Sequence, residues 1–200
     1  MEAIKTFKHK TKNRLLEIYQ DLYPTNPREE DNLGLMVCKH KDYDLGDEKI
    51  TEEGMKFAEY ELFLIKEKKA KVILPLYLYD HTEITINYER TYPFTCPWDT
   101  SEVGYIYATE DMIKKWFNVD KVGEKELEDT KKILKQEVKT YDNYIKGEIY
   151  LYNLLEVNEC NLGHKHENLL DSCGGFFYSD NLIDDIFIQM EEKIDDWEEE

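Results

Sequence analysis

A block of closely spaced strand patterns in the middle of the chain constrains the fold most. Residues 72–79, "VILPLYLY", are almost entirely apolar, which predicts a strand covered on both faces. Residues 84–89 alternate apolar and polar side chains, and the intervening "DHTE" suits a tight turn. Residues 103–108, "VGYIYA", predict a third strand. Strands so close in sequence pair as hairpins, so we expect a mainly antiparallel central sheet.

Helical patterns flank this block. The clearest covers 124–146, where apolar side chains recur at steps of three, four and seven and Gly147 follows the last turn. A shorter helix is predicted over 110–117, because Thr109 suits an N-cap and two carboxylates follow it. A third pattern begins after Thr51 and places four apolar residues on one face: Met55, Ala58, Leu62 and Ile65.

The two ends of the chain also show helical spacing. Residues 3–22 predict one amphipathic helix or two shorter pieces. After Ser179, an apolar stripe predicts a last helix through Ile183, Ile186, Met190, Ile194 and Trp197. A length of 200 residues suits one domain. We therefore expect an α+β fold in a single domain over 1–200, with an N-terminal helical segment (1–25), a core (26–178) and an acidic C-terminal helix (179–200).

The charge of the chain limits its partners. The sequence holds 44 acidic and 26 basic residues, a net charge of −18. Such a surface repels phosphate backbones, so it disfavours direct nucleic-acid binding and favours basic proteins as partners. Half of the net charge lies in 180–200. This run is either a solvated helix face or an acidic helix that presents its carboxylates to a basic groove on a partner protein. On the second interpretation, the residues predicted to bind a partner are Asp184, Asp185, Glu191, Glu192, Asp195, Asp196 and Trp197.

The sequence also indicates a compartment. Residues 1–20 lack the apolar region of a signal peptide, and no apolar run approaches the roughly 20 residues that cross a bilayer. We therefore expect a cytoplasmic protein, without a membrane partner, whose four cysteines are reduced. Neither GxGxxG nor GxxxxGK[ST] occurs, and we expect no cofactor.

Two residue sets have the composition of chemical sites. Cys96, His81 and Asp99 include the types of a nucleophilic cysteine, its base and an orienting carboxylate. Because Cys96 precedes Pro97 and opens no helix, a rigid loop into the next strand is the competing interpretation.

The second set supplies four nitrogen and sulfur ligands, as a tetrahedral zinc site does: Cys160, His164, His166 and Cys173. Its spacing, C-x3-H-x-H-x6-C, differs from a standard zinc knuckle, so the alternative is a polar loop without metal. Cys38 and His40 share one face of a strand predicted near 35–40. This face either forms the wall of a functional site, or Cys38 belongs to the core and His40 lies at its border.

Five segments carry a family resemblance. They read "NPREEDNLGLMVCKHKDYDLGD" (26–47), "VILPLYLYDHTEITI" (72–86), "CPWDTSEVGYIYAT" (96–109), "EVKTYDNYIKGEIY" (137–150) and "DSCGGFF" (171–177). In this order they resemble an uncharacterised family of acidic proteins encoded by bacteriophages, plasmids and other bacterial mobile elements. Family members often have "DSCWGFYG" where this chain has "DSCGGFF", so an aromatic residue is missing at Gly174.

The resemblance implies a genomic setting and carries over no catalytic residue. Small acidic proteins in that setting often block host defence nucleases, as anti-CRISPR and antirestriction proteins do. We therefore expect a non-enzymatic inhibitor of a basic host protein, such as a Cas effector or a restriction nuclease, that occupies its nucleic-acid groove. The alternatives are a small Cys/His hydrolase and a regulatory phage protein without pocket chemistry.

Overall fold

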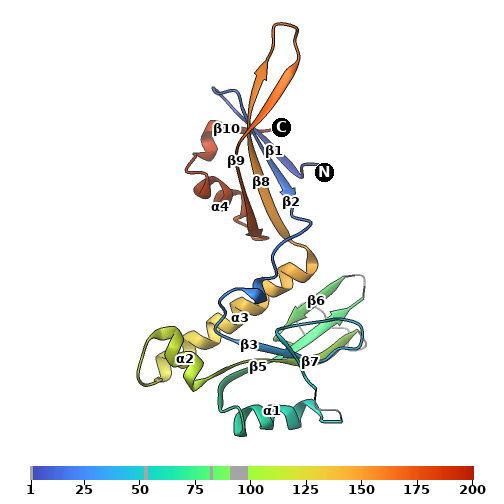
Figure 1. Ribbon diagram of the computed structural model, residues 1–200, viewed down its shortest axis with the longest axis vertical. Helices are drawn as coiled ribbons and strands as arrows, with labels where there is room; N and C mark the ends of the chain where they lie inside the picture. The colour runs from blue at the N-terminus through green and yellow to red at the C-terminus, as the bar shows by residue number, and fades with distance from the viewer. Residues whose placement is uncertain (1, 52–53, 82, 91–98) are drawn as a thin grey trace. The chain divides into compact units, whose positions relative to one another are not determined.

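The chain folds into two compact units. The computed structural model describes residues 2–51, 54–81, 83–90 and 99–200 (Figure 1). One unit, which we call the terminal unit, combines Met1–Thr25 with Gly147–Glu200, and the other, the central unit, is Asn26–Lys146. Each has its own sheet and its own apolar core. The fold is α+β as predicted, but this division differs from the single domain and single sheet expected from the sequence.

The described residues of the central unit form a five-stranded sheet in the order β4-β3-β7-β5-β6. The strands are β3 (Leu35–Cys38), β4 (Glu48–Lys49), β5 (Ala70–Asp80), β6 (Ile84–Asn87) and β7 (Thr100–Thr109). All pairs are antiparallel except β3 with β4. The predicted hairpin is confirmed as β5–β6, and the third predicted strand is β7. Gly104 of β7 lets β3 approach closely, because a Cβ there would overlap the carbonyl oxygen of Val37.

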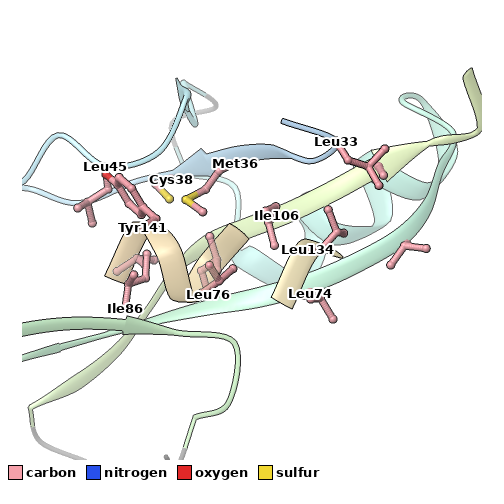
Figure 2. Packing of buried hydrophobic residues seen from close by; sticks show 14 of the residues in the cluster. Leu33, Met36, Cys38, Leu45, Leu74, Leu76, Ile86, Ile106, Leu134 and Tyr141 are labelled. Atoms are coloured by element: carbon pink, nitrogen blue, oxygen red, sulfur yellow. The ribbon is translucent and has the colours of Figure 1, made fainter. Parts of the chain in front are cut away.

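Helices cover both faces of this sheet. They are α1 (Phe57–Lys66), α2 (Glu110–Phe117) and α3 (Glu124–Lys146), with a short 3-10 turn, η1 (Pro27–Glu29). The predicted stripe of α3 is confirmed: Leu134 and Tyr141 point toward sheet residues that include Met36, Leu76 and Ile106 (Figure 2). The predicted cap of α2 is also present, since the Thr109 hydroxyl accepts a hydrogen bond from the Met112 N–H at 3.3 Å.

Helix α1 packs on the opposite face of the sheet, and its predicted face was wrong. Tyr60 and Leu64 are buried against Tyr105 and Tyr107 of β7, whereas Leu62 and Ile65, like Met55 before the helix, are exposed. The stripe Phe57, Tyr60, Leu64 has the same steps of three and four and buries more aromatic area, so it faces the sheet. In the part of the chain that the structure describes, none of the helices is long and apolar enough to cross a membrane.

A buried ion-pair network fastens the start of the central unit to its sheet and to α3. The guanidinium of Arg28, only 3% exposed, donates to both carboxylate oxygens of Asp47 (2.9 and 2.6 Å) and to Glu137 of α3 (3.0 Å). A further bond reaches the carbonyl of Gly34 at 2.7 Å. Burial alone lowers the pKa of Arg28, but the two carboxylates outweigh this effect and raise it.

Both carboxylates are satisfied by backbone as well. Glu137 accepts from the N–H of Leu33 at 2.8 Å, and Asp47 accepts from the N–H of Met36 at 2.6 Å. These bonds join the segment around Arg28, the turn at Asp47 and helix α3, which lie far apart in the sequence. The network therefore gives a structural reason for Arg28 and Asp47 in the segment 26–47 and for Glu137 in the segment 137–150.

The terminal unit is built on a second sheet, antiparallel throughout its described strands, in the order β10-β1-β2-β8-β9. Its strands are β1 (Lys5–His9), β2 (Arg14–Gln20), β8 (Ile149–Glu159), β9 (Lys165–Phe177) and β10 (Trp197–Glu199). Helix α4 (Leu182–Gln189) packs on one face, and a 3-10 turn, η2 (Ile194–Asp196), precedes β10. Leu16, Ile18 and Tyr152 of the sheet form the core with Ile186 and Phe187 of the helix.

The helical prediction for 1–25 was wrong, because residues 5–20 form the β1–β2 hairpin. Leu16 and Ile18 are fully buried two residues apart, which is the period of a strand. The helical spacing of Leu15, Ile18 and Leu22 combined two opposite faces of β2, on which Leu15 and Ile18 lie, with Leu22, which follows the strand. The core partner that favours the strand, β8, is more than a hundred residues away in the sequence.

The predicted C-terminal helix over 179–200 was also wrong in length, since α4 ends at Gln189. Glu191 takes a left-handed backbone conformation (φ 56°), and the chain then turns through η2 into β10. Trp197 pairs with His9 of β1, and its ring lies 4.9 Å from that imidazole and 5.9 Å from Phe187. Burying this indole in the sheet stabilises the turned conformation over a continued helix.

Candidate protein-interaction surface

The residues of the predicted cysteine site are only partly described. Cys96 lies outside the described residues. His81 is exposed beyond the end of β5, with its ring 6.3 Å from that of Tyr79, and the carbonyl of Asp99 accepts from the N–H of Asp80 at 2.9 Å. His81 and Asp99 thus lie at the same end of the β5–β7 ladder. Among the described residues, no hydrogen bond or ion pair joins their side chains, and the prediction for Cys96 stays untested.

The predicted zinc ligands lie on a β-hairpin, not in a loop. The N–H of Cys160 donates to the carbonyl of His164 at 2.9 Å in the β8–β9 turn, and His166 pairs with Asn158. Cys173 pairs with Tyr152, seven residues farther along β9 than His166, which is about 20 Å in a strand. Over the described ranges, no cluster of three His, Cys, Asp or Glu side chains is placed to hold a metal ion.

Cys38 and His40 do not form a site wall. Cys38 ends β3 and is buried, and burial, aided by the charge of Asp47, raises the pKa of its thiol to about 12. His40 follows the strand and stacks on Tyr43 with ring centroids 4.9 Å apart. Cys38 is therefore a core thiol that stays protonated at neutral pH.

The residues predicted to bind a partner separate into an exposed and a buried group. Asp184 and Asp185 are exposed in the first turn of α4, where the helix dipole also stabilises them. Further exposed carboxylates belong to Glu191, Asp195 and Asp196. In contrast, Trp197 is 4% exposed and is part of the core, so it is not available as a contact residue.

Part of the C-terminal acidity is neutralised within the terminal unit. Glu192 forms ion pairs with Arg14 (2.9 Å) and Lys12 (3.5 Å), and Glu199 pairs with Lys5 at 2.8 Å. The ammonium of Lys10 donates to the backbone carbonyl of Asp195 at 2.6 Å. The basic β1–β2 hairpin therefore holds the acidic C-terminal segment, which accounts for some of the charge run without any external partner.

Three of the carboxylates that remain lie next to an exposed apolar residue. Ile188 of α4 is 73% exposed and lies one turn after Asp184 and Asp185, on the same face of the helix. The N–H of Glu191 donates to the carbonyl of Ile188 at 3.1 Å, so Glu191 borders the same turn. We call Asp184, Asp185, Ile188 and Glu191 the acidic surface. The sequence prediction missed Ile188, although its place off the stripe of Ile183, Ile186 and Met190 was a signal for exposure.

The two units differ in charge. The terminal unit holds 18 acidic and 7 basic residues, a net charge of −11, and the central unit holds 26 and 19, a net charge of −7. The shorter unit is therefore the more acidic, and five of its seven basic residues belong to the segment 5–14. The long-range attraction for a basic partner is accordingly strongest at the terminal unit.

Comparisons with known proteins return no match to a protein-family model, to a curated protein or to a solved structure.

Proposed function

We propose that this protein is a non-enzymatic inhibitor of a host nucleic-acid-processing defence protein, of the anti-CRISPR or antirestriction type. In this proposal it is encoded by a phage or another mobile element and acts in the cytoplasm of the bacterial host. The observation that carries the proposal is the acidic surface, where exposed carboxylates surround Ile188 in the more acidic unit. Its partner is a basic groove that otherwise holds a phosphate backbone.

The mechanism follows from two contributions. The charge of the terminal unit steers it toward a basic groove and raises the association rate, an effect that falls as salt is added. Once the surfaces meet, Ile188 is withdrawn from water and supplies apolar contact, while Asp184, Asp185 and Glu191 pair with Lys and Arg of the groove. Nucleic acid is then excluded because the same cationic groups are occupied.

The test is inhibition of DNA cleavage by a panel of purified Cas effectors and restriction nucleases. The variant Asp184→Lys/Asp185→Lys reverses two charges in the first turn of α4. The matched control Glu124→Lys/Glu128→Lys changes the net charge equally at exposed positions near the start of α3. At low salt we expect the first variant to lose about 10-fold in inhibition, equivalent to ~1.4 kcal/mol, while the control inhibits as the wild type does.

An equal loss of inhibition in both variants would show that net charge, and not the acidic surface, is responsible. Inhibition by the first variant that equals that of the wild type would refute the role of the acidic surface. If the wild type inhibits none of the nucleases and binds none of them in co-purification, the proposed class is wrong.

A further inference from the structure

Strand β9 is an open edge of the terminal sheet. It spans 13 residues and, within the described part of the chain, pairs with β8 alone. Figure 1 shows the β8–β9 hairpin (orange) continuing past the end of β2, where β8 also loses its other neighbour. Most side chains of β9 are exposed. A long exposed edge presents unpaired backbone donors and acceptors to any strand that approaches.

The hydrogen-bond alternation identifies which residues face that edge. The N–H of Val157 donates to the carbonyl of Asn13 at 2.8 Å, so the backbone groups of Val157 point toward β2 and away from β9. Its partner across the hairpin, Glu167, is therefore in a non-hydrogen-bonded pair and directs its own N–H and C=O outward. By the same alternation, Lys165 and Leu169 also face the edge.

Two bulges limit the length of this edge. Leu170 is an extra residue between the pairs Leu155–Leu169 and Leu154–Asp171, and Gly175 (φ 85°) is an extra residue farther along. The regular stretch is therefore 165–169. Edge strands are commonly guarded by lysine, proline or bulges, and within this stretch Lys165 at its beginning is the one such residue.

The side chains along the edge are both apolar and acidic. Leu169 is 61% exposed and continues a row of cross-strand partners, Leu15 and Leu155, on the sheet face opposite α4. Glu167 stands next to it on the same face. It borders a hollow of about 280 Å³ there, which is lined by three carboxylates (Glu159, Glu167 and Glu200) and three cationic side chains (Lys8, Arg14 and Lys165). A strand added beside β9 would thus meet an aliphatic side chain and, two residues away, a carboxylate.

We propose that the 165–169 edge of β9 binds an extended segment of a basic protein as an additional strand. The segment carries an aliphatic residue opposite Leu169 and, two positions away on the same face of the added strand, a Lys or Arg opposite Glu167. The hairpin 149–177 carries four carboxylates and one lysine, which favours a basic segment. A second copy of the chain is disfavoured, because two terminal units of net charge −11 repel each other. For the class of partner this inference rests on the proposed function, but it uses residues outside the acidic surface.

The probe is a fluorescein-labelled peptide of Val-Thr-Lys-Thr repeats, which places Val and Lys in turn along one face of a strand; it is titrated with the full chain and followed by fluorescence polarisation. We expect the wild type to bind, and both Leu169→Lys and Glu167→Pro to weaken binding at least about 10-fold. Proline at 167 removes an outward N–H and no bond to β8. The matched control Leu162→Lys makes the same change as Leu169→Lys at a residue of the turn that is 82% exposed, and it should bind as the wild type does. Bound peptide should also slow amide hydrogen exchange at Lys165, Glu167 and Leu169.

Three results would overturn the inference. Equal binding of a peptide N-methylated along one edge would show that charge alone holds it. Equal weakening by Leu162→Lys would place the contact at the turn. Self-association of the wild type that Leu169→Lys abolishes would make a second copy the occupant. The wild type separates the two proposals: peptide binding without nuclease inhibition refutes the proposed function alone, and inhibition without peptide binding refutes this inference alone. The variant Asp184→Lys/Asp185→Lys should bind the peptide as the wild type does, because its substitutions lie outside the β9 edge.

Discussion

The substitution Arg28→Met is expected to destabilise the central unit more than any surface substitution of similar size. It removes a guanidinium that is 3% exposed and leaves the carboxylates of Asp47 and Glu137 buried without their cation. Removing one partner of a buried ion pair typically costs about 3–5 kcal/mol, because the remaining charge stays out of water. Here two carboxylates are left, so we expect a loss at the upper end of that range.

The assay is urea unfolding of the full chain, followed by backbone amide signals of α3 so that the central unit is observed by itself. With an m-value of about 1–3 kcal/mol/M, the loss moves the midpoint by on the order of 2 M. The variant Arg28→Lys should fall between the wild type and Arg28→Met, since an ammonium keeps the charge but loses the bidentate geometry with Asp47.

The matched control is Lys132→Met, which breaks an exposed ion pair with Asp129 (2.8 Å) on the same helix that carries Glu137. An exposed pair of this kind contributes about 0.2–1 kcal/mol. If Arg28→Met lowers the midpoint no more than Lys132→Met does, the network contributes nothing beyond a surface pair and the argument from burial is refuted.

Two further predictions follow from the pKa directions. Because burial raises the pKa of Cys38 to about 12, iodoacetamide at about pH 8 should modify Cys38 at least about a hundred-fold more slowly than Cys160, measured by mass spectrometry of the separated peptides; comparable rates would contradict its placement in the core. Burial also raises the pKa of Asp142 above its ordinary 3.8, against the opposing effects of Lys146 and the Ile86 N–H, so the folded state binds this proton more tightly than the unfolded state does. The stability of the central unit relative to Asp142→Asn should therefore fall as pH rises above about 4, and urea midpoints of the two proteins that change in parallel with pH would disprove it.

The sequence predicts the elements whose patterns are long and local. Helix α3 repeats its apolar stripe over 23 residues, and the β5–β6 hairpin is closed by neighbouring residues, so periodicity identifies both. The chain ends were mispredicted because their partners are remote. His9 pairs with Trp197 at the other end of the chain, and a short segment does not reveal which distant strand will complete its sheet.

The candidate surface was predicted only in part for a related reason. Counting charge identified Asp184 and Asp185, which are exposed, but it could not separate them from Glu192, which pairs with Arg14. Helical periodicity assigned Trp197 to the same helix as a contact residue, although the chain turns before it and buries the indole. The distinction depends on the three-dimensional position of the β1–β2 hairpin, which the local pattern does not contain.

This division of the carboxylates changes how many charges of the acidic C-terminal segment should be counted toward partner binding. A continuous helix would present its charges at every turn, as an isolated rod does, and the whole run would count toward a partner. In the folded segment, Glu192 and Glu199 neutralise the basic hairpin, whereas Asp184, Asp185 and Glu191 face outward around Ile188. Charge reversal at Glu192 and Glu199 should therefore change the stability of the terminal unit, because these carboxylates pair with the β1–β2 hairpin. Charge reversal at Asp184 and Asp185 should instead change binding to the proposed partner.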